Sequence, residues 1–283
     1  MSLKSLTKNR LKLCNYTSIR IGGPAPELFL ISSWEDLKEA ASRYKFDFYL
    51  LGAGSNLLVD DRGVTRPVIK LTGDFDFIGH KGYDVEVGAG TLFTQVINFC
   101  RAQALGGLEN LAGIPATIGG MLATNASAYQ RAISDHLLEV EIFDIKAKRR
   151  ILKKDEIKFS YRDSSLKGTI ILRAKFRLHE DRFIKEKVSD ILKERFAKQD
   201  YAHPSCGSIF KNPPGFAAGQ LIEACRLKGA RKNDAQISPK HANFIINLGK
   251  AACKDVEYLI HKAKEAVNKK FNIIMEEEVI RWI

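Results

Sequence analysis

A glycine-containing break between two apolar runs limits the folds open to this chain. Residues 48–51 are apolar, residues 52–56 read Gly-Ala-Gly-Ser-Asn, and residues 57–59 are apolar again. Glycines directly after a strand often let the backbone approach a phosphate. However, Leu57 stands where the dinucleotide fingerprint needs a third glycine, the continuation is strand-like, and no Gly-Lys-Ser/Thr follows. We therefore exclude a Rossmann motif and a P-loop. A strand–turn–strand loop remains, either an anion-binding nest or a plain tight turn.

A second glycine segment, residues 110–129 (NLAGIPATIGGMLATNASAY), favours the nest. It is too apolar for a solvated loop and too irregular for an amphipathic helix, so we expect another loop. Small residues allow a flat or bulky ligand to lie against the backbone. Two such loops suit a long ligand with phosphates at one end and rings at the other. A dinucleotide cofactor meets that description.

The composition narrows the choice of partners and compartment. The chain has 283 residues and a formal net charge of +12, which favours an anionic partner unless the lysines merely solvate helix faces. The lysines are dispersed, and no helix-turn-helix, RNP or zinc-finger pattern supports a nucleic-acid partner. The basic first 13 residues lack the apolar core of a signal peptide, and no apolar run is long enough to span a membrane. The five cysteines are scattered, without CxxC spacing. We therefore expect a protein of the reducing cytoplasm with neither a disulfide framework nor a metal site.

Hydrophobic periodicity predicts an α+β protein. Helices are expected at 33–45, 91–105, 181–199, 217–228 and from about 250 to 270. Their predicted buried faces include Leu92, Phe93, Val96, Ile97 and Cys100 in the second helix, and Ile184, Val188, Ile191, Leu192 and Phe196 in the third. Strands are expected at 83–90, 137–145, 169–178, 242–249 and 277–283. We expect Gly229 to stop the fourth helix, and a separate C-terminal α/β unit to begin near residue 195.

Six motifs in one order make the chain recognisable. They are Asn15–Gly23, Gly52–Gly63, Gly113–Tyr129, Phe159–Ser164, Gly207–Pro213 and Ala235–Asn247. Together they resemble the UDP-N-acetylenolpyruvoylglucosamine reductase family, from about residue 15 to the C-terminus. The family consists of flavoenzymes that complete UDP-N-acetylmuramic acid in peptidoglycan synthesis. The short span between residues 129 and 159 corresponds to the compact form, which lacks an extra tyrosine-bearing loop.

The resemblance implies a domain organisation and a reaction. Residues 1–70 and 71–194 would be the two FAD-binding subdomains of a vanillyl-alcohol-oxidase (PCMH) type module, and residues 195–283 an α/β substrate-binding domain. NADPH would reduce FAD, which would pass a hydride to the enolpyruvyl group of the UDP-sugar. We expect a monomer without nucleic-acid or membrane partners, although the sequence itself does not specify the oligomeric state. The alternative is an FAD-dependent oxidase of the same superfamily, but neither glycine loop holds the His or Cys that such oxidases often use to attach flavin.

Three catalytic residues follow from the resemblance. Arg162 matches the active-site arginine, Ser208 the proton donor, and Glu278 the C-terminal glutamate. On chemistry alone, Arg162 beside Asp163 would more often be a surface pair, and Ser208 a turn residue. A guanidinium does suit a carboxylate that becomes an enolate. Glu278 is preferred to its two neighbouring glutamates because it directly precedes Val279, although Ile280 departs from the family's Glu-Val-Arg pattern.

The resemblance also assigns ligand-contacting positions. The cofactor positions are Gly52, Ala53, Gly54, Ser55, Asn56, Leu57, Gly113, Pro115, Ala116, Thr117, Gly119, Gly120, Asn125, Ala128 and Tyr129. The substrate positions are Tyr161, Lys211, Asn212 and His241. Cys206 has no role in this chemistry. The chain departs from the family pattern at Ala53, Ser127 and Gln130, which bears on how tight the two loops are.

Overall fold

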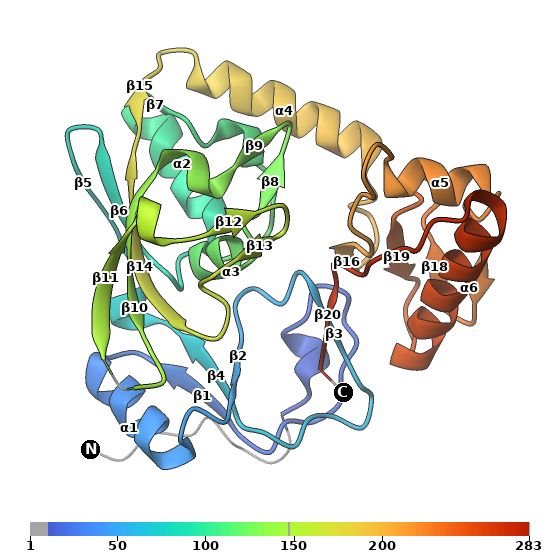
Figure 1. Cartoon of the computed structure of the whole chain (residues 1–283), viewed down its shortest axis with the longest axis horizontal. Helices are drawn as coiled ribbons and strands as arrows, with labels where there is room; N and C mark the ends of the chain where they lie inside the picture. Colours follow the sequence, from blue (N-terminus) through green and yellow to red (C-terminus); the bar gives the residue numbers. More distant parts are fainter. Residues whose placement is uncertain (1–10, 147, 283) are drawn as a thin grey trace. The chain divides into compact units, whose positions relative to one another are not determined.

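The computed structural model describes residues 11–146 and 148–282, and these form two compact units (Figure 1). The larger unit comprises Glu27–Ala53 and Arg66–Arg195. The smaller unit comprises residues 11–26, Gly54–Thr65 and residues 196–282. The expectation of a basic, signal-free start falls largely on residues 1–10, outside the described residues. The predicted split of the N-terminal part at residue 70 stays a prediction.

Two sheets organise the larger unit. A parallel sheet has the order β1 (Leu28–Ile31), β4 (Val68–Leu71), β2 (Tyr49–Leu50). An antiparallel sheet has the order β11 (Arg149–Lys153), β10 (Leu137–Phe143), β14 (Ile170–Arg177), β6 (Asp84–Gly88), β5 (Ile78–Lys81). Short pairs are formed by β12 (Phe159–Ser160) with β13 (Asp163–Ser164), β15 (His179–Glu180) with β7 (Leu105–Gly106), and β8 (Ser127–Ala128) with β9 (Arg131–Ala132). The strands predicted at 83–90, 137–145 and 169–178 are confirmed.

The helices of the larger unit complete its core. They are α1 (Trp34–Tyr44), α2 (Phe93–Gln103), α3 (Ile118–Ala123) and α4 (Ile184–Lys198), the last running up to the end of this unit and three residues beyond it. The sequence offers two capping patterns for this helix, Ser32-x-x-Glu35 and Ser33-x-x-Asp36. The second is the one formed, because the Ser33 side chain accepts a hydrogen bond from the Asp36 N–H. Buried side chains of α2 and α3 share one hydrophobic core with β6, β10 and β14.

The smaller unit combines three separate stretches of sequence. Its main sheet has the order β16 (Ser205–Ser208), β19 (Phe244–Asn247), β18 (Ala235–Ile237), β17 (Arg231–Lys232). Helices α5 (Ala218–Ala224) and α6 (Cys253–Phe271) contribute to its core. A parallel pair joins β3 (Leu57–Val59) to β20 (Ile280–Trp282). The smaller unit thus joins the C-terminal part of the chain to the segment after Ala53, and the predicted boundary near residue 195 stays a prediction.

Four local predictions are wrong. Residues 118–123 form helix α3 inside the segment expected to be a loop, because the Thr117 side chain caps it by accepting from the Gly120 N–H. Leu92 is the N-cap of α2 and is 42% exposed instead of buried, since its side chain lies outside the helical face. Phe196 is exposed because α4 reaches its last turn there. Helix α5 ends at Ala224, well before Gly229, which instead adopts positive φ in the following turn.

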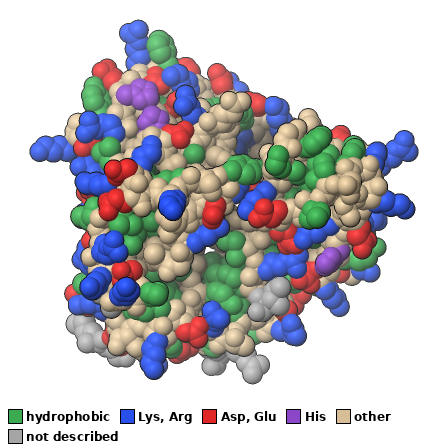
Figure 2. Space-filling model, viewed as in Figure 1, with side chains coloured by type: hydrophobic (Ala, Val, Ile, Leu, Met, Phe, Trp, Pro, Cys, Tyr) green, Lys and Arg blue, Asp and Glu red, His purple; other side chains and the backbone are tan. Residues whose placement is uncertain are grey.

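The surface charge is mixed. Figure 2 shows Lys and Arg side chains over the visible face with Asp and Glu between them, without a continuous basic stripe on that face. In the described part of the chain, no helix is both long and apolar enough to cross a membrane.

Candidate functional site

Gly52 follows β2 in the larger unit and lies against two polar side chains. Its carbonyl oxygen accepts a hydrogen bond from Nζ of Lys70 at 2.6 Å. A Cβ at Gly52 would lie 2.7 Å from Oγ1 of Thr117. Because that hydroxyl also caps α3, it has little freedom to move away. The glycine is therefore required by close packing in addition to any ligand.

The smaller unit begins again at Gly54, so the boundary between the units falls inside the first glycine loop. Gly54 has φ +67°, and a Cβ there would lie 2.0 Å from the carbonyl oxygen of Tyr16. The Ser18 N–H donates to the Gly54 carbonyl at 3.1 Å. Within the described residues, the N–H groups of Ala53, Gly54 and Ser55 make no backbone hydrogen bond. Such N–H groups are what an anion-binding nest requires.

The 113–120 segment is held mainly by contacts inside the larger unit. Gly113 has φ +85°, and a Cβ there would lie 3.1 Å from side-chain atoms of both Leu192 and Arg195 on α4. The Gly119 N–H donates to the Ala89 carbonyl at 2.9 Å, and a Cβ at Gly119 would lie 3.2 Å from the Ala89 Cβ. Packing alone therefore explains Gly113 and Gly119. Pro115 is exposed and Ala116 is half-buried.

Two hydrogen-bonded segments of the larger unit, one from the second glycine segment and one from β12 onward, carry Asn125 and Arg162 respectively. Nδ2 of Asn125 donates to the carbonyl of Ser160 at 2.9 Å. The backbone of Asn125 has φ +45°. Nη1 of Arg162 donates to the carbonyl of Ser127 at 2.9 Å and to its Oγ at 2.7 Å. The Arg162 guanidinium lies 5.4 Å from the centre of the Tyr161 ring. Ser127, one of the positions at which this chain departs from the family pattern, thus supplies a hydroxyl that accepts a hydrogen bond from Arg162.

The predicted residues beside these two are accessible. Tyr129 and Tyr161 are 43% and 51% exposed, and Ala128 is half-buried in β8. The side chain of Asn125 is buried, and its Oδ1 has no hydrogen-bond partner in the described part of the chain. Buried acceptors usually receive a hydrogen bond, and a ligand with an N–H or O–H group could supply it to Oδ1 of Asn125.

In the smaller unit, the backbone of Glu278 lies beside the segment that carries Ser208. The Glu278 N–H donates to the Ile209 carbonyl at 2.8 Å, one residue after Ser208. The Glu278 carbonyl in turn accepts from Nδ2 of Asn56 at 3.0 Å. Three predicted site residues that are far apart in the sequence are therefore neighbours. Cys206 is buried, and burial raises the pKa of its thiol to about 12, which disfavours the reactive thiolate.

The three C-terminal glutamates have different surroundings. The Glu276 side chain is 71% exposed and pairs with Lys211. The Glu277 side chain is only 18% exposed and pairs with both Lys264 and Arg281. Burial would raise the pKa of Glu277, but the hydrogen bond from Lys264 and the charge and hydrogen bond of Arg281 outweigh burial and lower it. Glu276 and Glu277 therefore each take part in an ion pair.

The predicted substrate residues of the smaller unit also have structural contacts. The Lys211 N–H donates to the Glu276 carbonyl at 2.9 Å. Oδ1 of Asn212 accepts from the Ala218 N–H at the start of α5 at 2.9 Å. Nδ1 of His241 accepts from the Asn243 N–H at 3.3 Å. These contacts fix the segments and do not by themselves identify a ligand.

Sequence reasoning missed two polar residues that shape these segments. Lys70 reaches Gly52, but a single lysine within Val-Ile-Lys-Leu gives no signal in the sequence. Asn243 is buried, and its side chain exchanges two hydrogen bonds with the backbone of Phe210, at 3.0 and 2.8 Å. Its signal is a lone amide within the apolar run Ala242–Ile246.

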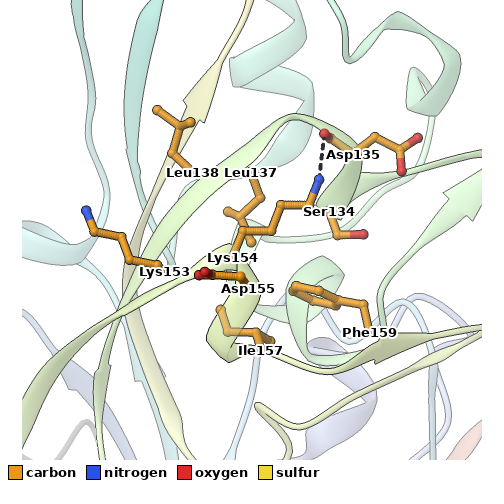
Figure 3. Close-up of a pocket in the computed structure, with 9 residues that line it drawn as sticks. All are labelled: Ser134, Asp135, Leu137, Leu138, Lys153, Lys154, Asp155, Ile157 and Phe159. Carbon is orange, nitrogen blue, oxygen red and sulfur yellow. Dashed lines mark hydrogen bonds between the residues drawn. The ribbon is translucent and has the colours of Figure 1, made fainter.

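A pocket of about 570 Å³ in the larger unit lies outside these residues (Figure 3). It is lined by Ser134, Asp135, Leu137, Leu138, Lys153, Lys154, Asp155, Ile157 and Phe159. Nζ of Lys154 donates to the Asp135 carbonyl at 2.9 Å across it. None of the predicted site residues lines this pocket.

Two family models match separate parts of this chain. Residues 30–151 match a family model described as an FAD binding domain, and residues 199–282 match the UDP-N-acetylenolpyruvoylglucosamine reductase C-terminal domain. The predicted α+β class, with an FAD-binding module and a C-terminal domain, is confirmed.

Similar proteins match over nearly the whole length. A UDP-N-acetylenolpyruvoylglucosamine reductase of Moorella thermoacetica is 39% identical over 100% of this chain and 94% of its own. One from Symbiobacterium thermophilum is 38% identical over 95% of this chain and 90% of its own. The crystal structure of the Thermus caldophilus reductase aligns with a TM-score of 0.88 at 37% identity and covers 100% of both chains. The chain therefore belongs to the UDP-N-acetylenolpyruvoylglucosamine reductase family.

Proposed function

We propose that this chain is an FAD-containing reductase that converts the enolpyruvyl group of UDP-N-acetylglucosamine enolpyruvate to UDP-N-acetylmuramate in peptidoglycan synthesis. NADPH is the proposed hydride donor. The observation that carries the proposal is full-length similarity to the reductases, with a C-terminal match over residues 199–282. That match disfavours the alternative of an FAD-dependent oxidase, because it is to the C-terminal domain of the reductase family itself.

The residues present fit FAD. The N–H groups of Ala53, Gly54 and Ser55 make no backbone hydrogen bond among the described residues, which suits a diphosphate. The buried Oδ1 of Asn125 needs a donor, and the cofactor carries ribityl hydroxyls and ring N–H groups. We assign residues 52–57 to the diphosphate and the 113–129 segment to the remainder of FAD.

The proposed chemistry divides between cofactor and protein. When bound, FAD supplies the hydride chemistry, and the protein supplies positioning and electrostatics. Arg162 holds the substrate carboxylate, whose negative charge grows as the enolpyruvyl group is reduced. Its guanidinium is pre-oriented by Ser127, so little reorganisation is required. Ser208 donates the proton to C2, and Glu278 stabilises the intermediate or assists that proton transfer.

For the UDP-sugar we assign Tyr161, Lys211, Asn212 and His241. Lys211 supplies a point charge suited to a diphosphate, although binding must compete with its pair to Glu276. We further propose that the protein is a cytoplasmic monomer. Size-exclusion chromatography with light scattering tests the oligomeric state.

Two measurements test the function. The purified protein should show flavin absorption bands that bleach with NADPH and return with the enolpyruvyl substrate. A protein that is colourless and cannot be reconstituted with FAD contradicts the proposal. Ser208→Ala should leave flavin reduction nearly unchanged and stall reoxidation by substrate. Ser205→Ala, three residues earlier in β16, is the matched control and should affect neither half-reaction. Equal slowing of both half-reactions in Ser208→Ala would remove Ser208 from the proposed role.

A further inference from the structure

Lys70 lies near the carboxyl end of β4. Strands β1, β4 and β2 form the parallel sheet of the larger unit (Figure 1). Strand β2 pairs with β4 in parallel, and Gly52 follows the end of β2. Both residues therefore lie at the carboxyl edge of this sheet. Ligands of open parallel sheets bind outside that edge.

The ammonium group of Lys70 is aimed at the Gly52 peptide. Its Nζ donates to the Gly52 carbonyl at 2.6 Å, and the Thr117 hydroxyl lies 2.7 Å from where a Cβ of the same glycine would be. A lysine has three N–H donors, and this hydrogen bond uses one of them. The remaining donors are available beside the residue at which the diphosphate loop begins.

The positive charge of Lys70 is not neutralised by a contact ion pair within the described residues. Removal from water lowers its pKa, and the charge of Asp76 only partly offsets this. By contrast, Lys187 and Lys153 each contact a carboxylate. Removing a lysine ammonium from water costs folding free energy, and a single carbonyl acceptor offsets this only in part. A bound anion would offset the remainder.

We propose that Lys70 is a cofactor-binding residue whose charge and free N–H donors hold the FAD diphosphate next to Gly52. The inference rests on FAD binding by this chain and adds a residue to that site. The competing interpretation is that Lys70 only supports the Gly52 carbonyl. In that case its loss would lower stability and would affect flavins with and without phosphates equally.

The test compares Lys70→Met and Lys70→Arg with Lys81→Met, a control at an exposed lysine of β5 in the same unit. Apoprotein is titrated with FAD and with riboflavin, which lacks phosphates, at several salt concentrations, following flavin fluorescence. Thermal unfolding of each apoprotein checks that it is folded.

We expect Lys70→Met to weaken FAD binding by about 10- to 100-fold, the effect of losing a charged hydrogen bond. Its affinity for riboflavin should be unchanged, and its FAD affinity should depend less on salt, since one charge contact is gone. Lys70→Arg should retain FAD affinity within roughly threefold because it keeps the charge. Lys81→Met should match the wild type.

Two outcomes overturn the proposal. One is an unchanged FAD affinity in folded Lys70→Met, and the other is an equal loss of FAD and riboflavin binding. If Lys70→Met does not fold, Lys70→Gln takes its place and the same two comparisons decide. A wild-type protein that fails to bind FAD under these conditions would refute the cofactor assignment itself, which is a separate result.

Discussion

Glu277→Gln offers a direct test of how the C-terminal glutamates divide their tasks. The Glu277 carboxylate contacts Nζ of Lys264 and is 2.7 Å from both Nε and Nη2 of Arg281. Arg281 also contacts Glu257 at 3.0 Å. Glutamine keeps the volume of the side chain and removes the charge shared by the two cations. The substitution therefore isolates the electrostatic contribution.

The size of the effect follows from this geometry. Hydrogen bonds to charged groups contribute about 1.5–3 kcal/mol, and partial exposure together with the remaining Arg281–Glu257 pair reduces the loss to about 1–2 kcal/mol. For a chain of this size that lowers the Tm by about 2–8 °C. Glu276→Gln removes only an exposed pair with Lys211, so the free energy of unfolding should change by less than about 0.5 kcal/mol.

The pH dependence has a definite sign. The folded-state pKa of Glu277 is lowered, so its stabilisation is present above the pKa of an unfolded glutamate, about 4.3. It is lost as the pH falls through the folded-state pKa. Thermal unfolding followed by circular dichroism at pH 7 and below pH 4 should show the Tm difference shrinking in acid. Equal Tm values for wild type, Glu276→Gln and Glu277→Gln at pH 7 would refute the reasoning, as would reoxidation slowed more by Glu277→Gln than by Glu278→Gln.

Two further substitutions test backbone requirements in the smaller unit. Gly54→Ala should destabilise the protein by about 2 kcal/mol or more, from left-handed strain and a clash with the Tyr16 carbonyl; unchanged urea unfolding would contradict this. Asp61→Ala removes the carboxylate that accepts from the Cys253 N–H at the start of α6 at 2.7 Å. It should cost about 1 kcal/mol in the same assay, and Asp61→Asn should recover most of that loss.

Local patterns predicted the elements well where one physical cause dominated. Ser33 caps α1 as its spacing with Asp36 indicates, because a cap depends only on a few adjacent residues. Helix α3 was missed because its signal comes from Thr117, a single capping residue inside an apolar run. The roles of Gly113 and Gly119 depend on α4 and on Ala89, which no local pattern reveals.

The sequence predicts continuous domains, whereas the units of the structure are discontinuous, and the reason is similar. Leu57 in β3 pairs in parallel with Ile280 in β20, so the segment after Ala53 groups with the C-terminal part of the chain. Such pairing depends on contacts between residues more than 200 positions apart, and alternation within either strand does not specify its partner. The candidate site shows the same limit. The motifs supplied Ser208 and Glu278, but only the fold shows that Ile209 joins their backbones.

Ile280 departs from the family pattern, and the arginine that follows it has defined ion pairs in this chain. Arg281 lies four positions after Glu277 and pairs with that carboxylate and with Glu257 on α6. In β20, Arg281 is aligned with Leu58 while Ile280 is aligned with Leu57. Arg281 is therefore engaged in the ion cluster of Glu277, and Glu278 retains its backbone hydrogen bond to Ile209.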